Sequence, residues 1–369
     1  MSTSTAIVAF EVRPLDIPLH EPFGISGGAQ AAANNVLVRC ELADGTRGYG
    51  EAAPLPPYNG ETQGQAITAL ESARAWLMGR DARDWRALAT EFRSREGARC
   101  GSAQCAFETA LLDALTRHDG IPLWRFFGGA AASATQAPAE LETDMTITTG
   151  SADAAAAAAQ AIRQRGIRMI KVKIGGAQGV AHDLARLTAI HAVVRDAPLI
   201  LDGNAGLTRA DATELVRGLK RQAIAPALLE QWLPKDDLEG MRALGVESGW
   251  LVAADESVTS AADAERVVAA RAAGAINIKL MKAGVAVALE IAAVARANHL
   301  ALMIGGNVES MLAMSMSACF AAGQGGFRFA DLDTPLFLAE NPFQGGYELK
   351  GGTISVAHIT AGHGVTPAD

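Results

Sequence analysis

The sequence predicts an α/β protein in which an N-terminal α+β capping domain precedes a (β/α)7β barrel. Three patterns support this prediction. Residues 1–60 are rich in strand-forming residues, and residues 61–120 carry apolar residues at helical spacing. From residue 141, short apolar segments alternate with helical ones, which is typical of a parallel sheet built from βα units. The 369 residues are enough for a large barrel and one further domain.

The N-terminal part is expected to contain a sheet followed by helices. Its strand-like segments are IVAFEVRPLDIPL at 7–19 and NNVLVRCELADGTRGYGEA at 34–52, the second with a hairpin turn at 44–46. Between these segments, the Gly-rich stretch FGISGGAQAAA at 23–33 is expected to be a loop. Three helices are predicted, at 65–77, 84–92 and 102–120. Together these elements make up a predicted capping domain over residues 1–135.

The second part is expected to close into a TIM-like barrel. Its eight predicted strands lie at 141–147, 168–174, 198–204, 227–232, 250–256, 275–280, 301–305 and 327–333. Helices between them include 151–166, whose alanine run favours helix, 180–196 and 284–299. Eight strands fit a closed barrel better than an open sheet. The catalytic barrel is therefore assigned to residues 136–335, and residues 336–369 are expected to return toward the capping domain.

Composition and missing motifs exclude several functions. The net charge is −8 and no dense basic stripe occurs, so nucleic acid is not an expected partner. No apolar run is long enough for a membrane span, and no secretory signal is evident. The four cysteines have no metal-binding spacing, which favours reduced thiols and a cytoplasmic location. Neither GxGxxG after an early strand nor GxxxxGK[ST] occurs, which argues against dinucleotide and P-loop binding.

Acidic residues stand at the ends of three consecutive predicted barrel strands, where barrel enzymes carry their chemistry. Asp202, Glu230 and Asp255 are 28 and 25 residues apart, which is about one βα unit each. They are therefore expected at similar heights around the barrel mouth. Three such carboxylates would repel one another unless neutralised, and a hard divalent cation such as Mg²⁺ would neutralise them. Alternatively, each acid caps a helix or pairs with a lysine.

Basic residues occupy neighbouring strand ends. Lys171 and Lys173 are two apart on one strand, so their side chains point the same way, and Lys279 approaches from the opposite side. A lysine acts as a base only if its pKa falls toward neutrality, and nearby positive charge lowers that pKa. The alternative is a set of salt-bridged lysines.

Asp331 and Asp333 follow the last predicted strand with the same two-residue spacing. Two acids on one face suit an ammonium group. Helix capping before TPLFL or plain solvent exposure would explain them equally well from spacing alone.

Several short signatures occur in order along the barrel, namely KVK, LDGN, LLEQ, AADES and INIKLMKAG. With these, the chain resembles the muconate lactonizing enzyme subgroup of the enolase superfamily over nearly its whole length, including GYGEAAP in the capping domain. LETDMTI and the DLD of FADLDTPLF resemble dipeptide epimerases of the L-Ala-D/L-Glu type. The resemblance therefore implies an isomerase, a Mg²⁺-dependent dipeptide epimerase with a small-molecule dipeptide as substrate.

The resemblance also implies residue roles. Asp202, Glu230 and Asp255 would ligate Mg²⁺, which the terminal carboxylate of the substrate would also bind. Lys173 would take the α-proton from one face, Lys279 would deliver one to the other, and Lys171 would stay charged. Asn204 and Glu256 would support the metal ligands. The expected substrate-binding residues are Asp331, Asp333, Thr146, Phe23, Ile25, Tyr58 and Asn307, with the first two holding the α-ammonium.

The chain departs from the Glu-specific pattern at two places. The stretch 23–33 has no arginine to pair with a glutamate side chain. A hydrophobic or cationic C-terminal residue is therefore expected, with Phe23, Ile25 and Tyr58 as an apolar wall and Glu61 as a partner for a cation. Loops at 22–33 and 53–62 are expected to close over the barrel and select the substrate. Trp232 replaces the proline usual after the EQ of this family, and we assign it no mechanism.

Other reactions on the same scaffold remain open. These are N-acylamino acid racemisation, o-succinylbenzoate synthesis and muconate cycloisomerisation, although their substrates lack the free α-ammonium that the DLD motif would bind. A non-catalytic small-molecule-binding barrel is an alternative of another class. Members of the family commonly self-associate, so a homo-oligomer is an expectation from the resemblance alone.

Overall fold

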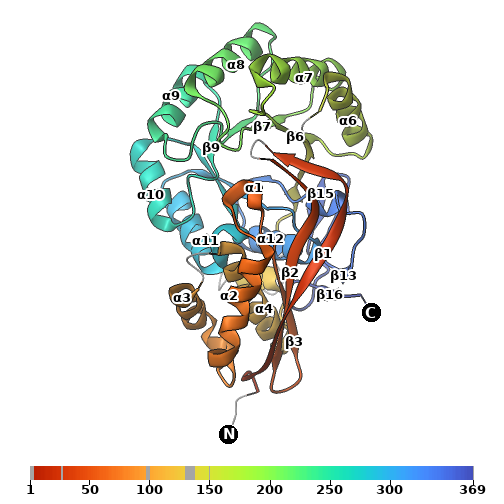
Figure 1. Ribbon diagram of the computed structural model, residues 1–369, viewed down its shortest axis with the longest axis vertical. Helices are drawn as coiled ribbons and strands as arrows, with labels where there is room; N and C mark the ends of the chain where they lie inside the picture. Colours follow the sequence, from red (N-terminus) through yellow and green to blue (C-terminus); the bar gives the residue numbers. More distant parts are fainter. Residues whose placement is uncertain (1–3, 26–27, 97–99, 129–137, 149, 369) are drawn as a thin grey trace.

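A barrel and an N-terminal capping domain pack against each other in the computed structural model (Figure 1). The structure describes residues 4–25, 28–96, 100–128, 138–148 and 150–368. The predicted boundary between residues 135 and 136 lies outside these ranges. No helix in the described part of the chain has the length and apolar character needed to cross a membrane.

Three antiparallel strands form the sheet of the capping domain, in the order β1 (Ile7–Ile25), β2 (Gly28–Leu42) and β3 (Arg47–Ala52). The predicted turn at 44–46 connects β2 to β3, and the Leu42 amide donates to the Thr46 carbonyl at 2.8 Å. The prediction of a loop at 23–33 is wrong for most of that segment. Phe23 pairs with Gln30 and Gly24 with Ala29, so this segment is the end of a long hairpin. Pairing with an aligned partner strand overrides the low strand propensity of its glycines and alanines.

Helices pack against this sheet and against one another. They are α1 (Pro56–Asn59), α2 (Gln63–Leu77), α3 (Trp85–Arg95), α4 (Gly101–His118) and α5 (Leu123–Gly128). The central helix, α4, lies directly against β3 because two glycines of that strand have no side chain. A Cβ on Gly48 would stand 2.1 Å from the Ala114 amide nitrogen, and one on Gly50 would stand 2.1 Å from the Ala106 carbonyl oxygen.

The barrel contains eight parallel strands in sequence order, as predicted. They are β5 (Asp144–Ile147), β6 (Met169–Lys173), β7 (Leu199–Asp202), β8 (Leu228–Glu230), β9 (Val252–Ala254), β10 (Ala275–Lys279), β11 (Ala301–Gly305) and β12 (Phe327–Ala330). A parallel bridge between Thr143 and Ala330 brings the first and last strands together. The barrel helices are α6 (Ala152–Gln164), α7 (Gly179–Val193), α8 (Arg209–Arg221), α9 (Leu238–Ser248), α10 (Ala261–Ala270), α11 (Leu280–Ala297) and α12 (Met311–Gln324).

The C-terminal segment contacts both parts of the molecule. Its short strands are β13 (Phe343–Gly345), β14 (Glu348–Lys350), β15 (Thr353–Ser355) and β16 (Val365–Pro367), and β15 pairs with β4 (Leu141–Glu142). Near its end, the Gly362 carbonyl accepts from the Leu123 amide at 2.8 Å, and the His363 amide donates to Asp113 on α4 at 2.9 Å.

Glu51 of β3 connects the capping domain to the barrel. Its buried carboxylate accepts hydrogen bonds from the Ser310 amide at 3.0 Å, the Ser310 hydroxyl, and the Ala313 amide at 3.2 Å. These groups form the beginning of α12, so a residue of one domain satisfies the free amides at the start of a helix in the other. The Asn35 side chain also donates to Glu51, at 2.7 Å.

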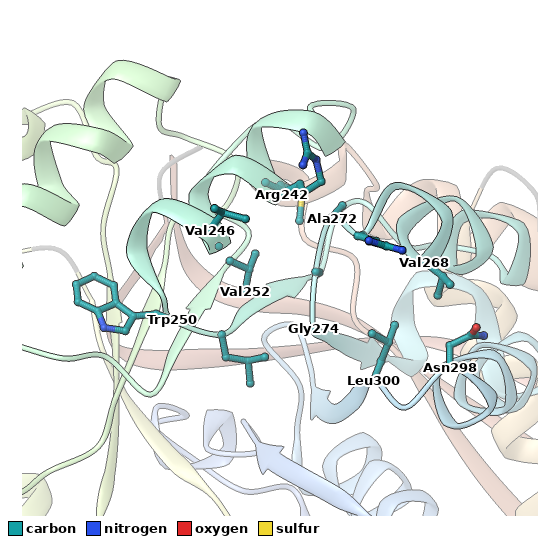
Figure 2. Close-up of a pocket in the computed structure, with 14 residues that line it drawn as sticks. Arg242, Val246, Trp250, Val252, Val268, Ala272, Gly274, Asn298 and Leu300 are labelled. Carbon is teal, nitrogen blue, oxygen red and sulfur yellow. The ribbon is translucent and has the colours of Figure 1, made fainter.

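A hollow of about 560 Å³ lies at the end of the barrel where β9 and β10 begin (Figure 2). Its lining includes Val252 at the start of β9, Gly274 before β10, and Trp250 and Val246 from the end of α9 and the loop that follows. This hollow lies at the opposite ends of the strands from the predicted site.

Candidate active site

The three predicted metal ligands lie together at the carboxyl ends of adjacent strands. Asp202 ends β7, Glu230 ends β8, and Asp255 follows β9 directly. Asp202 and Glu230 are partners in the strand register. All three side chains are fully buried. Parallel strands therefore place three carboxylates side by side at one end of the barrel.

Lys171 of β6 lies among these carboxylates. Its ammonium nitrogen is 2.9 Å from Asp202 Oδ2, 2.9 Å from Glu230 Oε2 and 2.6 Å from Asp331 Oδ2. Burial lowers the pKa of Lys171, but the surrounding carboxylates outweigh burial and raise this pKa well above its ordinary value. Lys171 is therefore held as a cation.

Lys173 and Lys279 approach the acids from two sides. Lys173 Nζ is 2.7 Å from Asp202 Oδ2, and Lys279 Nζ is 2.8 Å from Asp255 Oδ2. Their strands, β6 and β10, are separated by three others in the barrel. Burial lowers the pKa of Lys279, but the charges of Asp255, Glu230 and Glu256 together outweigh burial and raise that pKa above its ordinary value. Both lysines line one small hollow of about 20 Å³, which Asp331 also lines.

Apolar residues of the capping domain cover this hollow. Phe23, Leu55 and Tyr58 line it from above the barrel. The Tyr58 ring centroid is 4.4 Å from Lys279 Nζ, and the Phe23 ring centroid is 5.9 Å from Lys173 Nζ. Tyr58 also donates its hydroxyl to Asp255 Oδ1 at 3.2 Å. Ile25 belongs to β1, but its side chain lies outside the described structure.

Asp331 and Asp333 are buried beside β12, so they are not solvent-exposed acids. Asp333 Oδ2 accepts from the Thr146 amide at 2.6 Å, and Asp333 makes no side-chain cap on the turn at Thr334–Leu336. Burial, followed by the charge of Asp331, raises the pKa of Asp333 to about 7. Helix capping therefore does not explain these residues, and a cationic ligand would be stabilised next to them.

The donor set at β7 to β9 fits a divalent cation. Glu230 Oε2 and Asp255 Oδ2 are buried and accept no hydrogen bond within the described residues, although lysines lie at ion-pair distance. Burial and Asp202 raise the pKa of Glu230 to about 7. Hard carboxylate oxygens on three consecutive strand ends match the preference of Mg²⁺.

A second acidic group lies close by. Carboxylate oxygens of Asp144, Asp331 and Asp333 all lie within 4.8 Å of one another, which is tight enough to hold a metal ion. We favour the β7 to β9 set as the metal site because both candidate bases contact it, Lys173 at Asp202 Oδ2 and Lys279 at Asp255 Oδ2.

The supporting residues contact the ligands and each other. The Asn204 amide donates to Asp202 Oδ1 at 2.9 Å, and its side chain donates to Glu256 Oε1 at 3.3 Å. Burial, and then the charge of Asp255, raises the pKa of Glu256 to about 8. Asn307 lines the small hollow and donates to the Ala53 carbonyl at 2.9 Å, which ties the barrel to the capping domain.

Trp232 and Glu61 have structural partners. Trp232 is 1% exposed, and its indole nitrogen donates to the Leu201 carbonyl at 2.8 Å, so it fills the barrel behind β7. Glu61 accepts from the Gly101 amide at 2.7 Å, the Ser102 amide at 3.1 Å and the Ser102 hydroxyl at 2.6 Å. Its carboxylate thus caps the start of α4 and is not placed to receive a substrate cation.

Comparison with known proteins identifies the family. Residues 7–128 match the mandelate racemase/muconate lactonizing enzyme N-terminal domain, and residues 153–369 match the family described as enolase C-terminal domain-like. The chain belongs to the mandelate racemase/muconate lactonizing enzyme family. The resemblance inferred from the strand-end signatures is therefore confirmed.

Three relatives illustrate this membership. The chain is 51% identical, over 99% of both chains, to a protein of Herpetosiphon aurantiacus named aromatic dipeptide epimerase. A crystal structure of a mandelate racemase/muconate lactonizing protein from the same organism has a TM-score of 0.94, 51% identity and full coverage of both chains. An Enterococcus faecalis dipeptide epimerase, complexed with Mg and L-Leu-L-Tyr, has a TM-score of 0.91 and 28% identity, covering 98% of this chain and 99% of that one.

Four buried polar residues of this family member were missed at the site. Lys282 Nζ donates to Asp255 Oδ1 at 3.0 Å and to the Asn277 carbonyl at 2.7 Å, and Asn277 donates its side chain to Glu230 Oε1 at 2.7 Å. Gln231 accepts from the Asp255 amide at 2.9 Å. Asp144 lies below Thr146 on β5. Each of the four lies inside a strand-end signature that also carries a predicted site residue, so its position along the chain, although not its direction, could be read from the sequence.

Proposed function

We propose that this chain is a magnesium-dependent dipeptide epimerase that inverts the α-carbon of the C-terminal residue. The observation that carries the proposal is the placement of Lys173 and Lys279, which reach one small hollow from separate strands. Two bases on opposite sides of a bound α-carbon are what 1,1-proton transfer requires. The similarity to an aromatic dipeptide epimerase over nearly the full chain supports this assignment.

Asp202, Glu230 and Asp255 would hold the Mg²⁺ ion, as the unpartnered buried oxygens of Glu230 and Asp255 and the hard-donor chemistry of all three carboxylates indicate. When bound, the ion would supply positive charge where the substrate carboxylate gains negative charge. Asn277 and Gln231 would fix the orientation of these ligands through their bonds to Glu230 and to the Asp255 backbone.

The two lysines would move the proton. An α-proton beside a carboxylate is very weakly acidic, so its removal needs a base aimed at it and stabilisation of the resulting enolate. Lys173, as the neutral amine, would take the proton from one face, and the ammonium of Lys279 would deliver a proton to the other. Lys171, held as a cation by its carboxylate neighbours, would support the substrate carboxylate. The α-carbon of the product has the opposite configuration, although the substrate has not rotated within the site.

Asp331 and Asp333 would bind the α-ammonium of the dipeptide. Asp331 lines the hollow, and Asp333 is buried two residues further along the chain. Asp333 keeps one oxygen, Oδ1, free of hydrogen bonds within the described residues. A free ammonium is absent from N-acylamino acids and from the substrates of o-succinylbenzoate synthase and muconate cycloisomerase. This pair therefore favours a dipeptide over these alternatives.

The substrate we propose carries an apolar, preferably aromatic, C-terminal side chain. Phe23, Leu55 and Tyr58 offer an apolar cover, and the rings of Phe23 and Phe337 pack nearly at right angles with 5.4 Å between their centroids. Glu61 is committed to α4, which removes the support for a cationic residue. The segments 22–33 and 53–62, which carry this cover, would open to admit the dipeptide and close to exclude water. All four cysteines are free and buried, which supports our proposal of a cytoplasmic location.

A dipeptide library incubated with the enzyme and Mg²⁺ in D₂O tests the proposal by mass spectrometry. Deuterium wash-in and epimerisation are expected, with the fastest rates for aromatic and aliphatic C-terminal residues. A chelator should abolish the exchange, and added Mg²⁺ should restore it. A strong preference for Xaa-Glu would contradict the substrate assignment.

Matched N-acylamino acids serve as the control set, because they keep the α-proton and the carboxylate but lack the ammonium. Faster turnover of these compounds than of any dipeptide would move the assignment to N-acylamino acid racemisation. Absence of wash-in from every compound would indicate a non-catalytic barrel.

A further inference from the structure

Asp144 is an acidic residue that the mechanism above does not use. It lies on β5, two residues before Thr146, so both side chains point toward the barrel interior. Its side chain is fully buried, and neither carboxyl oxygen has a hydrogen-bond partner among the described residues. A buried polar group without a partner costs free energy, so this residue needs an explanation.

The donors around Asp144 are already committed to its neighbours. The ammonium of Lys171 lies 2.6 Å from Asp331 Oδ2 and also contacts Asp202 and Glu230. The Thr146 amide donates to Asp333 Oδ2 at 2.6 Å. The other oxygen of Asp333, Oδ1, is buried and has no hydrogen-bond partner either. The orphaned atoms are therefore both oxygens of Asp144 and one of Asp333.

These groups lie within reach of one another. Carboxyl oxygens of Asp144, Asp331 and Asp333 fall within 4.8 Å. Three ionised carboxylates at this separation repel strongly in a buried site, where Lys171 is shared with further acids. One proton on Asp144 removes one negative charge and creates a hydrogen-bond donor in a cluster that contains the unpartnered Oδ1 of Asp333.

We propose that Asp144 is a neutral carboxylic acid that donates a hydrogen bond to the Asp331–Asp333 pair and thereby positions that pair for the ammonium of the dipeptide. This inference rests on the proposed function. Burial, followed by the charges of Asp331 and Asp333, raises the pKa of Asp144 well above its ordinary value, in agreement with a neutral acid. Asp144 is a positioning residue, since it acts through Asp333 and transfers no proton to the substrate.

Two substitutions separate this role from an ionised third carboxylate. Asp144→Asn keeps the shape and provides an N–H donor in place of the acid O–H. Asp144→Ala removes the donor and leaves Asp333 Oδ1 unpaired. Calorimetry of the Mg²⁺-loaded enzyme would compare alanyl-tyrosine with propionyl-tyrosine, which lacks only the ammonium, and would give the ratio of their dissociation constants.

The wild type is expected to bind alanyl-tyrosine more tightly than propionyl-tyrosine. Asp144→Asn should keep this ratio within about threefold, while Asp144→Ala should reduce it about tenfold or more, since a buried acceptor loses its donor. Epimerisation should show the same split in KM, with kcat less affected.

Asp113→Asn is the matched control, because Asp113 is a fully buried aspartate of α4 that bonds the Tyr49 amide and Arg117. It should lower the melting temperature without changing the ratio. Equal loss of the ratio in Asp144→Asn and Asp144→Ala would overturn the neutral acid, because an ionised carboxylate is not replaced by an amide. An unchanged ratio in Asp144→Ala would also overturn it. If the wild type binds alanyl-tyrosine and propionyl-tyrosine equally well, the proposed ammonium site and the proposed function are both contradicted.

Discussion

The two ends of the barrel are built from the same strands but differ in chemistry. Where the strands end, buried acids and lysines surround a hollow of about 20 Å³ that the capping domain covers. Where β9 and β10 begin, the lining of the hollow of about 560 Å³ includes Val252, Leu300 and Arg242 but no acidic residue (Figure 2).

The size of a hollow is therefore a poor guide to chemistry in this molecule. The strand-end hollow is small because Phe23, Leu55 and Tyr58 cover it. Buried lysines and carboxylates are packed together in and beside it, a costly arrangement that persists only where charges pair or bind a ligand. We accordingly expect substitutions at the strand ends to change turnover and those at the strand beginnings to change stability.

The largest expected effect is the loss of either base. Lys173→Ala and Lys279→Ala should each reduce epimerisation about 10²- to 10⁴-fold or more, the usual contribution of a positioned acid or base. Chiral chromatography of the product measures this. In at least one variant, deuterium exchange should persist with one enantiomer only. Normal epimerisation by either variant would disprove the two-base assignment.

The next largest effect is expected at Asp331 and Asp333, the pair proposed to bind the substrate ammonium. Asp331→Asn and Asp333→Asn should lower kcat/KM for dipeptides about 10- to 100-fold, since a buried charge-assisted hydrogen bond is lost. Mg²⁺ affinity, measured by calorimetry, should stay close to that of the wild type because neither residue belongs to the β7 to β9 set. Loss of Mg²⁺ binding would instead favour the Asp144–Asp331–Asp333 group as the metal site.

A smaller effect is expected at the opposite end. Val252→Ala removes two methyl groups from a side chain that is 4% exposed, and should lower the free energy of unfolding by about 1–3 kcal/mol. Urea denaturation measures the loss. The kcat/KM for a dipeptide should not change. A fall in kcat/KM larger than about threefold would show that the two ends are coupled.

The smallest effect is expected at Val246, which is 77% exposed beside the same hollow. Val246→Ser should change the free energy of unfolding by no more than about 0.5 kcal/mol, as is usual for surface substitutions. It should also leave epimerisation unchanged. A clear loss of activity or of assembly in solution would show that this end of the molecule has a role of its own.

Much of the architecture follows from short-range patterns. Strand and helix periods are local, so all eight barrel strands and the main capping helices are predictable from the sequence. The end of the first hairpin is not, because Phe23 and Gln30 pair through the register of two long strands rather than through their own propensities. Glu61 was misjudged for a similar reason, since its partners lie 40 residues away at the start of α4.

The site was predictable where the spacing of single residues at successive strand ends was enough to place them together. Asp202, Glu230 and Asp255 follow from spacing because parallel strands place their ends at one height. Asn277 and Lys282 were missed because their roles depend on direction, which spacing does not give. Asn277 points into the barrel toward Glu230, and Lys282 folds back from the first turn of α11 onto Asp255. The alternative of lysines paired with acids is also present in the geometry, so charge pattern alone could not separate pairing from catalysis.

Glu51 makes the two domains unsuitable for exchange as separate modules. The first turn of α12 depends on a carboxylate from β3, and that carboxylate is in turn held by Asn35 of β2. A chimera that joins this barrel to a foreign capping domain would leave the Ser310 and Ala313 amides without an acceptor unless the donor supplies an acid at the same place. Recombination of specificity within this family is therefore most readily achieved by grafting the tip of the hairpin and the segment at 53–62, with β3 and α12 kept as one inherited unit.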